Sequence, residues 1–155
     1  MQPEPIQVMT VEDDPSFRKL LAVLLGACGR FRVHAADLDR WLEDVHETPP
    51  DILLLDLTLD AQDAVPHIPG IVAACPTTMV AALTARPAED EERSVLNAGA
   101  FTFYEKTRIH RLPDDLAEDL VLFRKALDGH DIVAPSALSR RQTTNEPAAS
   151  RSTTT

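Results

Sequence analysis

Short apolar runs alternate with longer amphipathic segments along most of the chain. The runs begin 25, 21, 26 and 23 residues apart, which leaves room for one helix and two turns between them. No sequence repeat accompanies this spacing, so a stack of repeats is not predicted. The central run is apolar at every position, as is typical of a parallel strand covered on both faces. The five predicted strands are Ile6–Val11, Phe31–His34, Ile52–Leu55, Thr78–Leu83 and Phe101–Tyr104.

Helices are predicted between these strands from apolar spacing and capping residues. Asp14 is placed to cap a helix that has Pro15 in its first turn, with Gly26 and Gly29 as stop signals. The other predicted helices cover residues 38–47, a short or late segment interrupted by Pro66, Pro69 and Gly70, residues 88–98 before Gly99, and residues 113–127. This alternation predicts an α/β fold, a doubly wound five-stranded parallel sheet with helices on both faces.

The composition changes near the end of the chain. From Ser139 onward Ser, Thr, Arg, Pro and Ala dominate and the apolar periodicity disappears. Such a segment cannot bury enough apolar surface to order itself, so it is predicted to be disordered or a linker. We therefore expect an N-terminal arm (residues 1–5), one folded domain (6–128) and a linker or disordered tail (129–155).

Charge and cysteine content narrow the class of protein. Fifteen Lys and Arg against 25 Asp and Glu leave a net charge of −10, which argues against direct binding of nucleic-acid phosphates. No apolar run approaches the roughly 20 residues that span a bilayer. The first residues do not form a secretory leader, and Cys28 and Cys75 are expected to be core thiols rather than a disulfide. A cytoplasmic domain is expected.

Chemically competent side chains follow the predicted strands. In a doubly wound sheet, ligands bind beyond the carboxyl ends of the strands. Each such residue alone is ordinarily a helix cap, a turn residue or a solvated charge. Asp14 already fills the cap position, however, and the coincidence at one edge favours a site. Its members are Glu12 and Asp13 after the first strand, Asp56 after the third, Thr84 after the fourth and Lys106 shortly after the fifth.

This set of groups suits phosphoryl transfer. Clustered carboxylates repel one another unless a cation joins them, and hard oxygen ligands suit Mg²⁺ or Mn²⁺. A carboxylate such as Asp56 can act as the nucleophile and form an aspartyl phosphate. Lys106 can neutralise phosphoryl oxygens and Thr84 can donate a hydrogen bond to them. The residues therefore favour phosphoryl capture on Asp56.

Four ordered motifs strengthen this interpretation. They are Val11-Glu12-Asp13-Asp14-Pro15 with Arg18; Pro50-Asp51-Ile52-Leu53-Leu54-Leu55-Asp56-Leu57; Leu83-Thr84-Ala85; and Ala98-Gly99-Ala100 followed by Lys106. With the alternating strands and helices, they resemble a response-regulator receiver domain of two-component signalling over about residues 5–128. The resemblance implies a flavodoxin-like fold with strand order 2-1-3-4-5.

The resemblance also implies a role for each site residue. Asp56 would be the phosphoacceptor, and Lys106 would pair with the phosphoryl group. The implied metal ligands are Asp13 directly, Glu12 through water, Asp56, and the backbone carbonyl of Thr58.

A switch is implied as well. Thr84 would move toward the phosphoryl group and Phe103 would turn inward, changing the surface of the fourth helix, fifth strand and fifth helix.

The implied function is signalling in a phosphorelay. A sensor histidine kinase or phosphotransfer protein would donate the phosphoryl group in a Mg²⁺-dependent reaction, and the changed surface would control an output that includes transcription. The chain is also expected to form a homodimer. It is expected to bind neither nucleic acid nor a membrane. No enzyme activity is expected.

Two alternatives stay open: a phosphorylation-independent interaction module, and a Mg²⁺-dependent phosphohydrolase with an aspartyl nucleophile. The second would usually need another Asp where Thr58 stands, and an inserted cap.

Three positions depart from the family pattern. Asp60 stands where Pro is usual and Ala64 where Gly is usual, so the loop after Asp56 is expected to have a different shape. An acid at position 60 would weaken the approach of an anion if it pointed inward. Thr107 replaces the Pro that commonly follows the lysine, which removes the usual reason for a cis peptide there.

Overall fold

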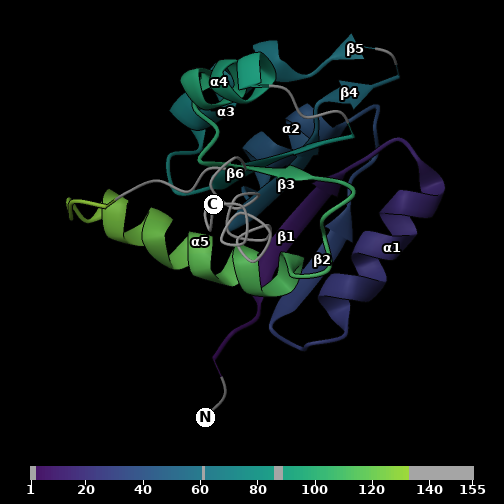
Figure 1. Ribbon diagram of the computed structural model, residues 1–155, viewed down its shortest axis with the longest axis horizontal. Coiled ribbons are helices and arrows are strands. Elements are labelled where there is room, and N and C mark those ends of the chain that lie inside the picture. Colours follow the sequence, from purple (N-terminus) through teal and green to yellow (C-terminus); the bar gives the residue numbers. More distant parts are fainter. Residues whose placement is uncertain (1–2, 61, 86–88, 133–155) are drawn as a thin grey trace, which may run out of the picture.

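Five parallel strands form one sheet in the order β2-β1-β3-β6-β7 in the computed structural model, which describes residues 3–60, 62–85 and 89–132 (Figure 1). These are the first to fifth strands of the sheet in chain order, so the predicted order 2-1-3-4-5 and the doubly wound fold are confirmed. Their bounds are β1 Ile6–Val11, β2 Phe31–Ala35, β3 Ile52–Asp56, β6 Met79–Thr84 and β7 Thr102–Glu105.

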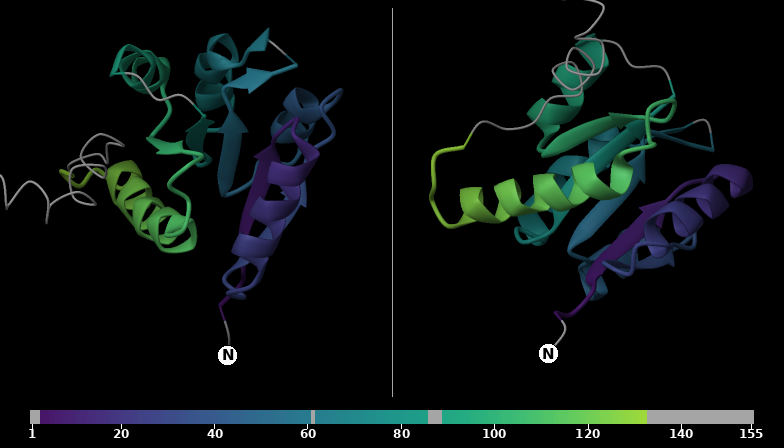
Figure 2. Two further views of the ribbon diagram at one scale, coloured as in Figure 1. Left: turned by 45° about the vertical axis from the view of Figure 1, so that its right-hand side comes forward. Right: turned by 60° about the horizontal axis from the view of Figure 1, so that its bottom comes forward.

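Helices cover both faces of this sheet. The right-hand view of Figure 2 shows α5 and α1 on the same side, and their apolar residues share one buried cluster. The apolar residues of α2, α3 and α4 belong to a second cluster, which lies on the other face. The helices are α1 Pro15–Gly26, α2 Trp41–Glu47, α3 Ile68–Ala74, α4 Glu89–Ala98 and α5 Leu112–Leu127.

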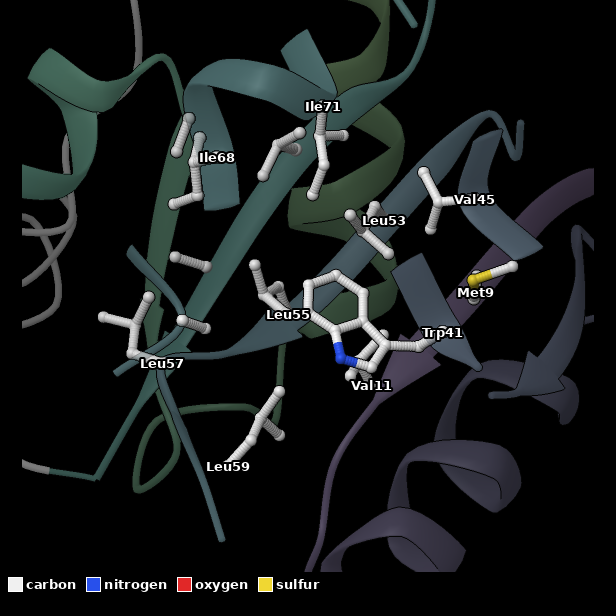
Figure 3. Close-up of a cluster of buried hydrophobic side chains, with 14 of the residues drawn as sticks. Met9, Val11, Trp41, Val45, Leu53, Leu55, Leu57, Leu59, Ile68 and Ile71 are labelled. Atoms are coloured by element: carbon white, nitrogen blue, oxygen red, sulfur yellow. The ribbon is translucent and has the colours of Figure 1, made fainter. Parts of the chain in front are cut away.

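The central strand supplies both cores. Leu53 and Leu55 belong to the cluster under α2 and α3, whereas Ile52 and Leu54 belong to the cluster under α1 and α5. All four side chains are fully buried. Figure 3 draws the first cluster, with Trp41 of α2 among side chains from β1 and β3. The unbroken apolar run therefore reflects a strand that alternates between two covered faces.

Short-range hydrogen bonds of aspartate side chains precede α1 and α2. Asp14 caps α1 as predicted, because its Oδ1 accepts a hydrogen bond from the Ser16 N–H at 3.0 Å. The predicted first residue of α2 was wrong, since the helix starts at Trp41 and not at residue 38. Asp37 explains the delay: its side chain accepts from the N–H of Asp39 and its carbonyl from that of Arg40, which forms a turn before the helix.

A hairpin outside the main sheet was not predicted. Strands β4 (Thr58–Leu59) and β5 (Gln62–Asp63) pair antiparallel just after β3, and Figure 1 shows them beside each other. A 3₁₀ turn, Val65–His67, then leads into α3, which is the short, late helix expected from the prolines. The chain therefore folds back over the carboxyl end of β3 before it crosses to β6.

The two cysteines occupy different environments. Cys75 is buried, with its thiol 3.7 Å from the carbonyl of Val45, as predicted for a core thiol. The same prediction was wrong for Cys28, which is exposed just past the end of α1. Its thiol donates to the Leu25 carbonyl at 3.3 Å, so the residue closes the end of the helix on the solvent side.

Three further expectations concern the C-terminal tail, the peptide bond before Thr107 and membrane-spanning helices. The predicted disorder from Ser139 onward lies outside the described residues. Every peptide bond within the described ranges is trans, that before Thr107 included. Among the helices of the described residues, none combines the length and apolar character that crossing a membrane requires.

A buried carboxylate fastens α5 to β7. Asp119 is almost fully buried, and its Oδ2 accepts hydrogen bonds from the hydroxyls of Thr102, at 3.1 Å, and Tyr104. Asp119→Ala leaves both hydroxyls without this acceptor, so we expect the free energy of unfolding to fall by roughly 1–3 kcal/mol. Urea denaturation measures the loss. Glu118→Ala, on the exposed side of the same helix, is the control and should change stability by less than about 0.5 kcal/mol; equal losses would refute the role of Asp119.

Candidate functional site

The carboxyl ends of three neighbouring strands bring the predicted residues together. Strand β1 pairs with β3, and β3 with β6, so the segments that follow these strands emerge at one rim. Oxygens of Glu12, Asp13 and Asp56 all lie within 4.8 Å of one another. Lys106 directly follows β7 and reaches the same cluster. Residues that are 94 positions apart (106 − 12) therefore lie in one cluster, and the role of that cluster stays a prediction.

Lys106 bridges two of the carboxylates. Its Nζ lies 2.6 Å from Oε1 of Glu12 and 3.1 Å from Oδ2 of Asp56. The amine also lies 4.8 Å from the ring centroid of Phe17 on α1, a cation–π contact that the sequence interpretation did not include. Burial works against the charged amine, but its hydrogen bond to Glu12 and the charge of Asp56 outweigh this effect and raise the pKa of Lys106. The amine is thus held charged at the centre of the site.

Glu12 is the most deeply buried acid of the set. Its side chain is fully buried, and its Oε2 accepts a hydrogen bond from the Asp14 N–H at 3.1 Å. Burial, followed by the hydrogen bond with Asp56, raises the pKa of Glu12 to about 7 despite the opposing effect of Lys106. This carboxyl therefore changes charge close to neutral pH.

Asp13 lies nearer the surface and is held by the hairpin. Its Oδ2 accepts a hydrogen bond from the backbone N–H of Asp60 at 2.9 Å. This hydrogen bond is the main cause of a lowered pKa for Asp13, because it favours the ionised carboxylate. Asp13 therefore stays ionised more readily than Glu12.

The oxygen-rich set fits a hard divalent cation. Two carboxylates that follow β1 and one that ends β3 converge on one small volume, and the amine of Lys106 pairs with two of them. Mg²⁺ typically binds one or two carboxylates and keeps several waters. Thr58 was predicted to bind the cation through its backbone carbonyl. In the structure its N–H donates a hydrogen bond to Oδ1 of Asp56 at 3.2 Å. Its carbonyl as a ligand stays a prediction.

The two predicted switch residues lie on the paired strands β6 and β7. Thr84 ends β6 and is buried, and its carbonyl accepts the Lys106 N–H at 2.8 Å, which ties the two positions together. Phe103 is fully buried in the cluster under α2 and α3, so the ring is already on the inner side. The movement of Thr84 stays a prediction, whereas Phe103 already has the inward position that was expected of it only after phosphorylation.

Two of the departures from the family pattern, Asp60 and Ala64, lie in the loop after Asp56. Asp60 lies at the turn of the β4–β5 hairpin with a positive φ of 49°, in the left-handed region where Asp is one of the few tolerated residues. Its side chain is exposed. Ala64 has a φ of −85°, so no glycine is needed there, and its N–H closes the hairpin by donating to the Leu57 carbonyl at 2.8 Å.

Comparisons with known proteins identify the family and support the fold. Residues 8–116 match the family model of the response regulator receiver domain. A curated relative, protein-glutamate methylesterase/protein-glutamine glutaminase 2 of Anaeromyxobacter dehalogenans, is 35% identical over 104 residues, covering 66% of this chain and 30% of the relative. A crystal structure of a CheY-like receiver domain protein from Methanospirillum hungatei has a TM-score of 0.70 at 20% identity and covers 79% of this chain and 99% of that one.

The curated relatives correct one expectation. Two more of them, from Syntrophus aciditrophicus and Pseudomonas aeruginosa, are also named protein-glutamate methylesterase/protein-glutamine glutaminase. Because these names denote enzymes, the expectation of no enzyme activity was wrong. This chain spans 30–42% of the length of the three relatives. The family match covers most of the chain and includes the acidic rim formed by Glu12, Asp13 and Asp56. The chain therefore belongs to the response-regulator receiver domain family of two-component signalling.

Proposed function

We propose that this receiver domain accepts a phosphoryl group on Asp56 from a phosphohistidine of a sensor histidine kinase or phosphotransfer protein in the cytoplasm. The observation that supports it most directly is the bridging position of Lys106, whose amine lies 3.1 Å from Asp56 inside a cluster of acids. An ammonium group at that distance from Asp56 would neutralise the negative charge of the phosphoryl oxygens as they approach the carboxylate. Asp56 is itself buried except for a small exposed edge, so only a compact group can approach it.

The reaction is an exchange of one bond to phosphorus. An oxygen of Asp56 attacks the phosphorus atom, and an O–P bond forms as the N–P bond of the phosphohistidine breaks. The histidine nitrogen leaves with the electron pair and takes a proton from solvent. This displacement needs positioning and charge neutralisation more than covalent assistance. Lys106 supplies a fixed positive charge, and the hydroxyl of Thr84 at the end of β6 is proposed to donate to a phosphoryl oxygen.

A divalent cation, Mg²⁺ or Mn²⁺, would be held by Asp13 and Asp56 directly and by Glu12 through water. When bound, it would neutralise phosphoryl oxygens that Lys106 does not reach. The convergence of three carboxylates within 4.8 Å supports this assignment, because such a cluster is repulsive without positive charge. Ordering of the rim would then bias Thr84 and Phe103 and thereby the α4–β7–α5 surface, where output partners or a second copy of the chain would bind.

The affinity for Mg²⁺ is expected to depend on pH. The pKa of Glu12 is raised to about 7, so a proton occupies this carboxyl at lower pH and removes one negative charge from the site. Affinity should therefore increase several-fold as the pH rises from about 6 to about 8, and then level off. Isothermal titration calorimetry measures it. Glu12→Gln should lose this dependence; an unchanged pH profile in the variant would refute the assignment to Glu12.

One experiment separates the candidate functions. The chain is incubated with acetyl phosphate, with Mg²⁺ or with a chelator, and weighed by mass spectrometry. A single labile adduct that needs Mg²⁺ supports phosphoryl acceptance. Sustained turnover of varied phosphoesters would favour a phosphohydrolase, and neither an adduct nor Mg²⁺ binding would favour a phosphorylation-independent interaction module.

Control of a protein-glutamate methylesterase/glutaminase is a second candidate output. Its support is the 35% identity to a relative with that name. The test measures methanol release from a methyl-esterified protein by such an enzyme in the presence of this chain, with and without acetyl phosphate. A change in rate that depends on Asp56 supports this output, and an unchanged rate argues against it.

A further inference from the structure

The turn of the β4–β5 hairpin reaches across to Asp13. The backbone N–H of Asp60 donates to Oδ2 of Asp13 at 2.9 Å, although the two residues are 47 positions apart in the chain. Asp13 follows β1, whereas Asp60 belongs to the connection between β3 and β6. The contact therefore joins two separately positioned segments at the rim.

The hairpin is anchored well enough to hold this contact. The side chains of Leu57 and Leu59 are buried in the cluster under α2 and α3, and Figure 3 labels both of them there. At the base, the Ala64 N–H donates to the Leu57 carbonyl at 2.8 Å, and Oδ1 of Asp63 accepts the Val65 N–H at 3.0 Å. The base of the turn is thus anchored by contacts other than the one with Asp13.

The backbone of Asp60 is suited to this role. Strand pairing of Leu59 with Gln62 leaves a two-residue connection, and residue 60 has the positive φ that tight hairpin turns require. A proline at this position would have no N–H to donate and could not adopt that φ. The bond to Asp13 is therefore available because Asp, and not Pro, occupies position 60.

We propose that Asp60 is a positioning residue for the cation site, acting through the carboxylate of Asp13. Its N–H donates to Oδ2 and thereby holds the Asp13 carboxylate beside those of Glu12 and Asp56. Partners of this kind, behind a metal ligand, typically contribute 10–100-fold to metal affinity. The proposal rests on the cation-binding part of the proposed function and adds that the hairpin and the cation stabilise each other.

Three substitutions separate the N–H from the charge of the side chain. Asp60→Asn and Asp60→Gly both keep the N–H and tolerate a positive φ, and they remove the carboxylate. Asp60→Pro removes the N–H. We expect Mg²⁺ affinity, measured by calorimetry, to stay within about threefold of the unmodified chain in the Asn and Gly variants and to fall roughly tenfold or more in the Pro variant.

A reciprocal measurement needs no substitution. Because coupling between two binding events is mutual, saturating Mg²⁺ should slow hydrogen exchange of the Asp60 amide by the same factor, roughly tenfold. NMR exchange rates measure this even if the Pro variant does not fold. A hydrogen bond that only supports the fold would protect the amide equally with and without Mg²⁺.

The outcomes are distinct. If the unmodified chain binds no Mg²⁺, the cation-binding part of the proposed function fails and this inference fails with it. If the chain binds Mg²⁺ but exchange at Asp60 does not change, or the Pro variant binds as tightly as the Gly variant, only the role of Asp60 is overturned.

Discussion

The Asp56→Asn variant is expected to incorporate no phosphoryl group from acetyl phosphate, under conditions in which the chain without the substitution is fully phosphorylated. The amide is nearly isosteric with the carboxylate, but its oxygen is a much weaker nucleophile and it cannot form the mixed anhydride. Mass spectrometry of the intact chain measures the adduct. Hydroxylamine should remove the adduct from the phosphorylated chain that carries no substitution, as expected for an acyl phosphate.

An aspartate just before the same strand provides the control. Asp51 precedes β3 at its other end, where its Oδ2 accepts the Gln7 N–H at 2.8 Å and its Oδ1 pairs with Arg124. Asp51→Asn keeps an acceptor oxygen and lies far along the strand from the acidic rim, so phosphorylation should be unchanged. An adduct that persists in Asp56→Asn, or that disappears equally in Asp51→Asn, would contradict Asp56 as the phosphoacceptor.

Lys106→Met is expected to have the largest effect on stability. The variant keeps an apolar chain against Phe17 but leaves Glu12 and Asp56, both buried, without their shared cation. Removing one partner of a buried ion pair costs about 3–5 kcal/mol. We expect roughly 3 kcal/mol in the free energy of unfolding at pH 8 without divalent ions, the lower end of that range, because the rim is partly open to water.

The pH dependence identifies the cause. The folded chain already holds the proton of Glu12 up to about pH 7, above its ordinary pKa of 4.5, so folding binds protons in this range and stability falls as pH rises. Loss of the amine removes the one opposing charge and should steepen that fall. The deficit should therefore be smaller at about pH 5.5 than at pH 8, and Mg²⁺ should recover part of it.

Urea denaturation at both pH values, with and without Mg²⁺, tests this prediction. Lys125→Met removes an exposed lysine from α5 and should change the free energy of unfolding by less than about 0.5 kcal/mol. A deficit for Lys106→Met that is equal at the two pH values and insensitive to Mg²⁺ would show that lost packing, rather than unpaired charge, is responsible.

The strands and the members of the site were predictable because their signals are local. A run such as Ile52–Leu55 can only be covered on both faces, and Asp14 before Pro15 marks a helix start by capping chemistry alone. Gly99, predicted as a helix end, has a φ of 121°, and an added Cβ would lie 3.0 Å from Val72. In a parallel sheet the ends of such strands necessarily meet, so the acidic rim followed from the strand assignments.

The missed features depend on contacts that no local pattern encodes. The β4–β5 hairpin has strands of two residues each, too short for any periodicity. The bond from Asp60 to Asp13 involves a backbone N–H, which every non-proline residue has, so the side chain gives no signal. Cys28 was assigned to the core from its apolar neighbours, but the end of α1 turns it to solvent.

The unequal placement of the two thiols gives the unmodified chain two built-in reporters. A thiol-specific reagent should label Cys28 rapidly, because it is exposed, and Cys75 only when the layer of α2 and α3 separates from the sheet. Burial also raises the pKa of Cys75, which slows its reaction further. The slow phase of labelling therefore reports the free energy of opening one helical layer, and a ligand bound at the acidic rim can be detected by how far it lengthens that phase.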